Sequence, residues 1–513
     1  MNMKLSLITA GVLLSTNLFG ASYATKQDYK NNKWRTILLK KELKKLKKEL
    51  LKVEKKLGTI ENSKNDNSLK KDFEELKSEI EDYDLEDISD RLDTVETMAL
   101  KDKISFSIGF KTRVDNYQTK MGNGDIKTDN NQWSEKVYLN MKSKISDNMK
   151  FVGRLSMQKN WANSGMHPYS YMDPMQGRTN DAGSTLYVER AYINWVLNPT
   201  AYIPVALTIG RQPSSDGPSY NIMDNTTRKS TYSALTFDGA ADGIVATFNT
   251  NNVVSKSNIK LAYGKGYQHN KDGADSDLKD TNVYGILIEK QLPESVAENS
   301  LFQIGYVAIT DMIADMSGMN GVNMSNPNTD SIGDMDLFGA MIELQKINDS
   351  KFDAFAHLGF NRVKPNGKVM KIDMNQDGTI TPDENFGLLT NSGDTKTKNG
   401  YAIWIGGKYS INKHHQVGLE YNHGSKNWIA MTQGSHDPYN KLATRGNAIE
   451  GYYNYIINRN AFLRFGVVDI NYNYSGSGWH IGTPMKIDDM PSVYKAQTIK
   501  QIIDEYVTLN ILF

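Results

Sequence analysis

The chain has 513 residues, with 60 Lys and Arg against 59 Asp and Glu, and no cysteine. This near-zero net charge creates no positive field that would attract nucleic acid, so no nucleic-acid partner is expected. The absence of cysteine excludes disulfides, thiolate metal sites and covalently attached c-type haem on this chain. Its 27 Tyr and 40 Gly, with only 13 Pro, favour an all-β architecture of many short segments.

Residues 1–24 have the pattern of a secretory signal peptide. Lys4 precedes an apolar run from Leu5 to Phe19, and the small residues Ser22 and Ala24 occupy the −3 and −1 positions of a cleavage site. A short membrane anchor is the alternative, but the run is too short to span a bilayer comfortably. No later segment approaches 18 consecutive apolar residues, so a mature chain that spans a membrane has to do so as a β-barrel.

Residues 25–102 are expected to form a periplasmic α-helical segment. Apolar residues at alternating spacings of four and three, from Lys33 to Leu57 and again from Leu69 to Met98, indicate two coiled-coil seams. The first helix carries a net charge of +8 and the second of −8, which favours side-by-side pairing. The pairing is either a hairpin within one chain or a contact between the chains of a homo-oligomer. A solvated charged stalk is the alternative.

From residue 103 to 513 the pattern changes to the period of two that β-strands have. The segment ISFSIGF places Ile104, Phe106 and Ile108 on one face and small residues on the other. Segments of about ten residues, apolar on one face and polar or small on the other, are typical of a transmembrane antiparallel β-barrel of the outer membrane. A soluble sandwich shows the same alternation, so this pattern does not decide between them.

Two further features favour the barrel. The chain ends YVTLNILF, with Val507, Leu509, Ile511 and Phe513 on one face, and this ending resembles the C-terminal signal by which outer-membrane barrels are recognised for insertion. The links between the expected strands alternate between short and long, as periplasmic turns and external loops do. We count sixteen strands, with eighteen as the alternative, beginning near residues 104, 133, 150, 185, 203, 230, 258, 281, 300, 335, 352, 399, 415, 446, 461 and 498. An even count puts both ends of the barrel in the periplasm.

Four stretches of the barrel region carry a family resemblance. They are FKTRVDNYQTKM at 110–121, YVERAYINW at 187–195, IGRQPSSDGPS at 209–219 and LTFDGA at 235–240. Together they resemble a family of outer-membrane porins of epsilon-class proteobacteria, long without an assigned function. The likeness is good from 103 to 248 and architectural beyond, and Gln212 stands where the family often has an arginine. The resemblance implies the outer membrane of a Gram-negative cell, but neither a solute nor catalytic residues.

The stretch DMNQDGTITPDE, residues 373–384, has the spacing of a calcium loop, with a glycine at its sixth position. The expected ligands are Asp373, Asn375, Asp377, Thr379 through its backbone carbonyl, Thr381 directly or through water, and Glu384. The helices that usually flank such a loop are missing, because Pro365 and Gly367 break any helical run before it. We therefore expect structural calcium in an external loop whose ends are held by neighbouring strands or loops. A polar turn without metal is the alternative.

Charged residues on the polar face of the strands are expected to line a pore. The basic set is Lys111, Arg113, Lys136, Lys142, Arg154, Arg190, Arg464 and Lys500, and the acidic set on the opposite arc is Glu289, Glu343, Asp353, Glu420 and Glu450. Two such arcs would set a transverse field across a water-filled lumen; the alternative is that polar lumen residues simply alternate in sign. The link 211–229 can fold inward as a constriction.

No pattern indicates an enzyme, because none of the eight histidines lies in a hydrolase or metalloprotease motif. The sequence therefore predicts a passive diffusion channel for small hydrophilic solutes, embedded in outer-membrane lipid. Two other interpretations stay open. One is a structural envelope protein whose coiled coil reaches toward peptidoglycan and whose barrel is an anchor. The other is a barrel sheath around an electron-transfer partner.

Overall fold

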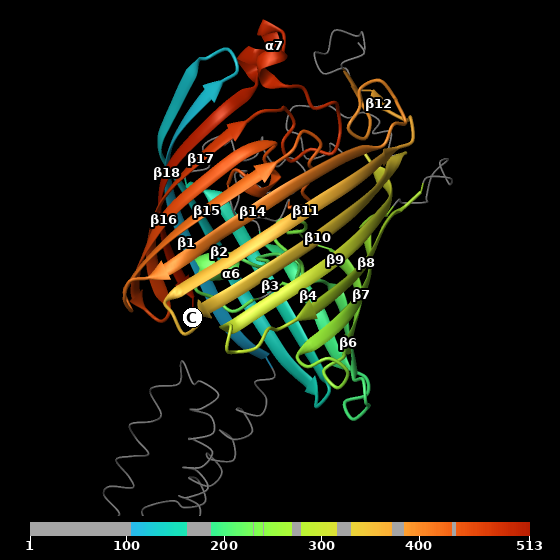
Figure 1. The fold of residues 1–513 in the computed structure, drawn as a ribbon, viewed down its shortest axis with the longest axis vertical. Coiled ribbons are helices and arrows are strands. Elements are labelled where there is room, and N and C mark those ends of the chain that lie inside the picture. Colours follow the sequence, from blue (N-terminus) through green and yellow to red (C-terminus); the bar gives the residue numbers. More distant parts are fainter. Residues whose placement is uncertain are drawn as a thin grey trace, which may run out of the picture. The chain divides into compact units, whose positions relative to one another are not determined.

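The computed structural model describes residues 104–161, 186–228, 230–239, 241–268, 279–314, 330–371, 384–432 and 438–512. Sixteen strands among these residues close an antiparallel barrel, in which each strand pairs with the barrel strands before and after it and β18 returns to β1 (Figure 1). The strands are β1 (Ile104–Met121), β2 (Ile126–Ser146), β3 (Met149–Asn160), β4 (Tyr187–Val196), β5 (Val205–Arg211), β6 (Asp242–Asn249), β7 (Ser257–Tyr267), β8 (Thr281–Lys290), β9 (Ala297–Ile313), β10 (Ser331–Ile347), β11 (Phe352–Pro365), β14 (Lys398–Ser410), β15 (His415–Gly424), β16 (Gly446–Asn458), β17 (Ala461–Tyr472) and β18 (Ile499–Leu512). The all-β prediction is confirmed, and of the two strand counts sixteen is correct and eighteen is wrong.

Several sequence predictions lie outside the described residues. They are the signal peptide at 1–24, the helical segment at 25–102, the terminal Phe513 and five of the calcium ligands, Asp373, Asn375, Asp377, Thr379 and Thr381. The sixth predicted ligand, Glu384, is described and is buried. The helices of the described part are α6 (Tyr220–Met223), α7 (Ser492–Gln497) and the 3₁₀ turns η3 (Lys441–Ala443) and η4 (Ile487–Asp489). None of the described helices is long and apolar enough to cross a membrane.

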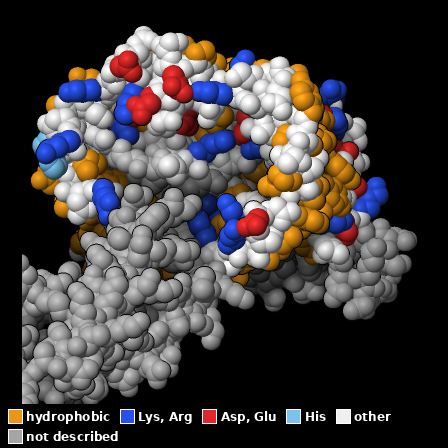
Figure 2. All heavy atoms as spheres, turned by 90° about the horizontal axis from the view of Figure 1, so that it is seen from below, with side chains coloured by type: hydrophobic (Ala, Val, Ile, Leu, Met, Phe, Trp, Pro, Cys, Tyr) orange, Lys and Arg blue, Asp and Glu red, His pale blue; other side chains and the backbone are white. Residues whose placement is uncertain are grey.

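The outer face of the barrel is apolar. Alternate residues of each strand point outward, and most of these outward residues are apolar. On β1, for example, Phe106 is 61% exposed, and on β15 Leu419 is 63% exposed. At the end of the barrel seen in Figure 2, hydrophobic side chains gather on the outer wall, whereas Lys, Arg, Asp and Glu side chains lie around the rim. A closed wall with an apolar outside and a polar inside is the arrangement that a lipid bilayer requires of a barrel.

Aromatic side chains form a row on the outer face of strands β9 to β14. Tyr306, Phe338, Phe360 and Tyr401 follow one another in register across these strands. The ring centroid of Phe338 lies 4.8 Å from that of Tyr306 and 6.1 Å from that of Phe360. The next outward residue of β11 is the exposed Arg362, so the row marks one edge of the apolar band. Such rows are typical of membrane barrels, because aromatic rings are favoured at the level of the lipid headgroups.

The links alternate in length as the sequence predicts, except that the first link, 122–125, is short. At one end of the barrel they are 147–148, 197–204, 250–256, 291–296, 348–351, 411–414 and 459–460. At the other they are 122–125, 161–186, 212–241, 268–280, 314–330, 366–397, 425–445 and 473–498. Figure 1 shows the short links at the lower end of the barrel, with α7 and β12 at the upper end. The strands β12 (Met370–Lys371) and β13 (Asn385–Phe386) pair with each other and lie outside the barrel sheet.

Two strand starts differ from the prediction by more than four residues. β2 begins at Ile126 rather than near 133, because residues 126–132 continue the hairpin with β1. β6 begins at Asp242 rather than near 230. The residues before it satisfy their backbone groups elsewhere: the Ala234 N–H donates to the Pro218 carbonyl, and the Asp238 N–H donates to the Met431 carbonyl. The segment that alternation assigned to the wall is therefore part of a longer link that lies inside the barrel.

Hydrophobic packing holds the links 212–241 and 425–445 against the inner wall. Leu235 of the first and Trp428 of the second share one buried cluster with Trp404 of β14. All three side chains are fully buried. The outward apolar face and this inward cluster are separate, so the barrel has an apolar band outside and a partly apolar filling inside.

Candidate functional site

The link 212–241, here called the lumen loop, reaches from one side of the barrel to the other. Its Asp216 contacts Arg154 of β3, with 2.7 Å between the Oδ2 and Nη1 atoms. Its Asp224 lies 2.8 Å from Arg464 of β17. Farther along the loop, the Arg228 guanidinium lies 2.6 Å from Glu289 of β8. Because β3, β8 and β17 are far apart in the barrel order, the loop crosses the interior.

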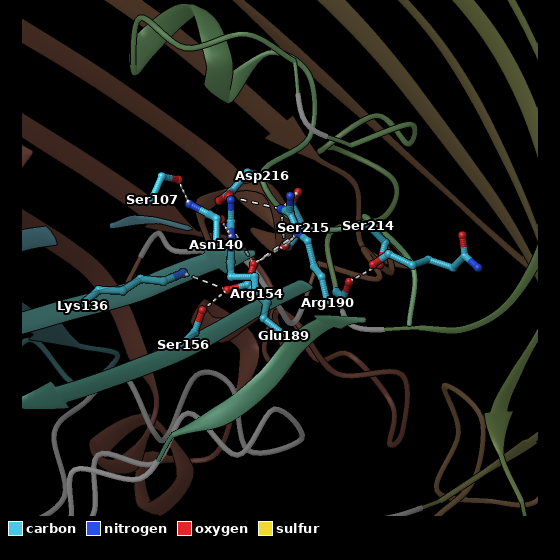
Figure 3. Close-up of polar contacts among 12 residues, drawn as sticks. Ser107, Lys136, Asn140, Arg154, Ser156, Glu189, Arg190, Ser214, Ser215 and Asp216 are labelled. Atoms are coloured by element: carbon cyan, nitrogen blue, oxygen red, sulfur yellow. Dashed lines mark hydrogen bonds and ion pairs between the residues drawn. The ribbon is translucent and has the colours of Figure 1, made fainter. Parts of the chain in front are cut away.

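One anchor of the lumen loop is a cluster of three cations and two carboxylates (Figure 3). Arg154 lies 2.9 Å from Glu189 of β4, and the Arg190 guanidinium lies 3.3 Å from Asp216. Lys136 of β2 is 3.6 Å from Glu189. Because four of these five residues are at least nine-tenths buried, removal of one partner is expected to cost about 3–5 kcal/mol. Asp216 and Arg190 also fix the loop to β4 at the point where it enters the lumen.

A second anchor lies on β10 and β11. The Ser219 hydroxyl donates to Glu343 at 3.0 Å, and the Asn221 amide donates to the other oxygen of Glu343 at 2.6 Å. His357 contacts Ser219 at 3.1 Å through Nε2 and Ser233 at 2.6 Å through Nδ1. His357 therefore joins both limbs of the lumen loop. Ser219 and His357 are each fully buried, so this serine–histidine contact fits a clamp on the loop rather than a site open to substrate.

The end of α6 forms a third anchor. The Arg464 guanidinium donates to the Met223 carbonyl at 2.6 Å, and the Lys408 ammonium donates to the Ile222 carbonyl at 2.6 Å. Carbonyls at the end of a helix have no partner within it, and cations there also complement the helix dipole. Lys408 further lies 3.3 Å from Asp353 of β11.

The link 425–445 contributes one more charged cluster. The Lys441 ammonium lies 2.7 Å from Glu420 of β15 and contacts Glu450 of β16. The Tyr506 hydroxyl donates to the other oxygen of Glu450. This cluster closes a further part of the interior with paired charges, and it holds the second link to the wall opposite β5.

Two cavities border the lumen loop. The larger has a volume of about 1050 Å³ and is lined by Arg228 and Asn225 of the loop, Glu289 and Glu343 of the wall, and residues of the short links such as Asp349. The smaller has a volume of about 300 Å³ and lies against β1 and β2. Residues of the short links line both, so both cavities are reached from that end of the barrel.

The predicted pore-lining residues all lie on the inner face. The structure brings Lys136, Arg154 and Arg190 together, and it pairs Lys408 with Asp353. Most of the basic arc presents no unpaired positive charge to the lumen, because acidic residues nearby form ion pairs with its cations. Arg113, for example, lies 2.5 Å from both Asp115 and Asp504. The members at the barrel ends differ from the rest: Lys142 is exposed, and Lys500 pairs with Asp488 of η4.

Sequence reasoning missed Glu189, which alternation placed outside because Arg190 faces inward. A bulge explains the difference: Arg154 pairs with Arg190 while Leu155 pairs with Val188, so Glu189 is an extra residue in β4. A bulge turns two consecutive side chains toward one face. It also missed Asp216, Asp224 and Lys441, whose role depends on where the long links fold. The inward fold predicted for 211–229 is confirmed, and the inward segment extends to residue 241.

Comparisons with known proteins give a family and distant structural similarities. The structure of Salmonella typhi OmpF in complex with daunomycin is 12% identical, with a TM-score of 0.44 over 80% of this chain and 99% of that chain. In-vitro folded OmpT, an outer membrane protein of Vibrio cholerae in trimer form, is also 12% identical, with a TM-score of 0.37 over 80% of this chain and 100% of that one. No curated protein matches the sequence. Residues 127–513 match the family described as protein of unknown function (DUF3373), and the chain belongs to that family.

Proposed function

We propose that the protein is an outer-membrane diffusion channel for small hydrophilic solutes, narrowed by its lumen loop. The observation that carries the proposal is the cavity of about 1050 Å³ inside a closed barrel, lined by charged and amide side chains. Water and polar solutes are favoured in such a cavity, whereas the apolar outer band favours lipid. The barrel therefore has the two surfaces that a passive channel needs.

The outer face of the barrel and the N-terminal sequence support a location and a mode of assembly for the protein. The aromatic row and the exposed aliphatic side chains support insertion into the outer membrane, and the predicted signal peptide supports export to it. The two oppositely charged helices would lie in the periplasm, where they pair within one chain or assemble a homo-oligomer. The resemblance to porins of epsilon-class proteobacteria implies the same location.

A structural anchor is the second candidate, and the packed interior favours it. Leu235, Trp404 and Trp428 form a dry cluster where an open channel would have water. A barrel closed in this way would hold the helical segment in the envelope, within reach of peptidoglycan, without conducting. The two interior links also occupy the space that an electron-transfer partner would need, so a sheath is not proposed.

The test is ion conductance of the full chain in planar bilayers. A diffusion channel gives discrete current steps, whereas an anchor gives none although the barrel inserts. The ion selectivity of a charge variant then shows whether the ions pass beside the lumen loop. Reversal of Arg113 is unsuitable, because it would bury three carboxylates together beside Asp115 and Asp504.

Arg228→Gln is the better charge variant. Arg228 lines the large cavity, and its partner Glu289 keeps Lys260 at 2.9 Å and Gln303 at 2.9 Å after the change. Loss of one positive charge should shift the reversal potential toward cation preference. The matched control is Arg362→Gln on the outer face of β11, which should leave selectivity unchanged. Absence of current steps in the inserted wild type would refute the channel.

A further inference from the structure

The smaller cavity, of about 300 Å³, lies between the lumen loop and the wall. Lys111 of β1 and Lys136 of β2 line it on the wall side, and Asp216 and Asp224 line it on the loop side. Residues of the short links at 411–414 and 459–460 complete the lining. The cavity is therefore a pocket that opens toward the same end of the barrel as the larger one.

Cations on the inner wall near the lumen loop have acidic partners. Arg113, Lys136, Arg154, Arg190, Lys260, Lys408 and Arg464 each form an ion pair with a carboxylate. Lys111 differs. Within the described part of the chain it makes no hydrogen bond and no ion pair, although it is partly buried and lines the cavity.

The acids that line the cavity are committed to arginines. Asp216 lies 2.7 Å from Arg154 and 3.3 Å from Arg190, and Asp224 lies 2.8 Å from Arg464. Each of these is a charge-assisted contact that uses one oxygen of the carboxylate. Neither carboxylate makes a direct ion pair with Lys111 in the described part of the chain, although the charge of Asp224 attracts its ammonium through space.

Two more cations stand at the mouth of the cavity. Lys413 and Arg459 lie on short links and are exposed, and both belong to its lining. An anion approaching from this end meets exposed positive charge first and then the ammonium of Lys111. Such a graded positive field raises the local concentration of anions.

We propose that this cavity binds a small oxyanion, a carboxylate or a phosphate group, through the ammonium of Lys111 with Lys136 beside it. A partly buried ammonium without a partner is unfavourable, and a bound oxyanion compensates it with charge-assisted hydrogen bonds. The cavity volume of about 300 Å³ equals that of about ten water molecules at ~30 Å³ each, which is room enough for an acetate or a phosphate ion. The inference rests on the proposed channel and specifies its solutes: anionic ones would pause at this site as they pass.

The test compares Lys111→Met with Lys111→Arg and with Lys120→Met. Methionine keeps the length of the side chain and removes the charge, whereas arginine keeps the charge. Lys120 lies on the outer face of the same strand, ~30 Å from Lys111 at 3.3 Å per residue, and is exposed. Single-channel currents are recorded in potassium chloride with increasing sodium phosphate or sodium acetate.

In the wild type, added oxyanion should lower the chloride current by occupying the site. Lys111→Met should raise the half-blocking concentration about tenfold, while Lys111→Arg and Lys120→Met stay near the wild type. An effect of both salts indicates the shared oxyanion chemistry, and an effect of phosphate alone restricts the site to phosphate. The site is refuted if neither salt lowers the chloride current of the wild type, or if the half-blocking concentration is the same in Lys111→Met as in the wild type.

A second measurement does not depend on conduction. Phosphorus NMR of inorganic phosphate should show line broadening with the detergent-solubilised full chain, and about tenfold weaker binding with Lys111→Met. If the protein gives no current steps but broadens the phosphate line through Lys111, the channel is refuted and the oxyanion site stands. If current steps occur without broadening, the site is refuted and the channel stands.

Discussion

Leu235→Ala should release the lumen loop without opening the barrel. Leu235 is fully buried in the interior cluster with Leu337, Trp404 and Trp428, and it belongs to no strand. Truncation of a buried leucine costs about 3 kcal/mol, because the lost transfer free energy and the cavity left behind add. Since every 1.4 kcal/mol is a factor of ten, the undocked population of the loop should rise on the order of 100-fold. The hydrogen-bonded strand ladder is untouched, so thermal unfolding of the barrel should change little.

The assay uses the absence of cysteine in the chain. Ala234→Cys, introduced at a fully buried position next to Leu235, gives one thiol that a water-borne reagent reaches only when the loop undocks. If redocking is faster than labelling, the labelling rate follows the undocked population. It should therefore rise on the order of 100-fold in Leu235→Ala. The control is Leu419→Ala, which removes a leucine that is 63% exposed on the outer face. Equal labelling rates in the two backgrounds would refute the view that hydrophobic packing docks the loop.

Three other predictions concern the ends and loops of the barrel. Burial raises the pKa of Asp238 well above its usual range, so the folded loop loses stability as the pH rises above ~4, by about 1.4 kcal/mol per pH unit until that raised pKa is reached. Asp238→Asn should therefore slow labelling of Ala234→Cys at pH 7 but not at pH 4, and equal slowing at both values would contradict the assignment. Asp373→Ala combined with Glu384→Ala should abolish protection of the link 366–397 against protease in millimolar calcium, with barrel melting nearly unchanged. A wild type that calcium does not protect would show the loop to be a polar turn. Deletion of Phe513 should sharply lower outer-membrane assembly, and normal amounts of assembled protein would argue against a C-terminal insertion signal.

Long-range contacts decided which charges are paired, and no pattern in the sequence contains that information. Glu189 was assigned to the outside because alternation assumes a regular ladder, whereas one bulge in β4 turns it toward Arg154. Asp216 and Lys441 lie on long links, whose course depends on packing against distant strands. The members of the basic and acidic arcs face inward, but that they line a pore stays a prediction, and their pairing with local acids followed from tertiary contacts.

The sequence by itself determined the barrel, its sixteen strands and the alternation of short and long links. Each of these depends on local alternation and turn length, which neighbouring residues encode. It also indicated that the link after β5 folds inward, although not how far. The predicted start of β6, near residue 230, is 12 residues before the observed start at Asp242. The prediction failed because LTFDGA alternates like a strand of the wall. In the structure, Leu235 instead packs on Trp404 and Trp428 inside the barrel. Only the tertiary structure, in which residues from opposite sides of the barrel meet, showed that Lys111 lies beside a cavity without a direct ion pair among the described residues.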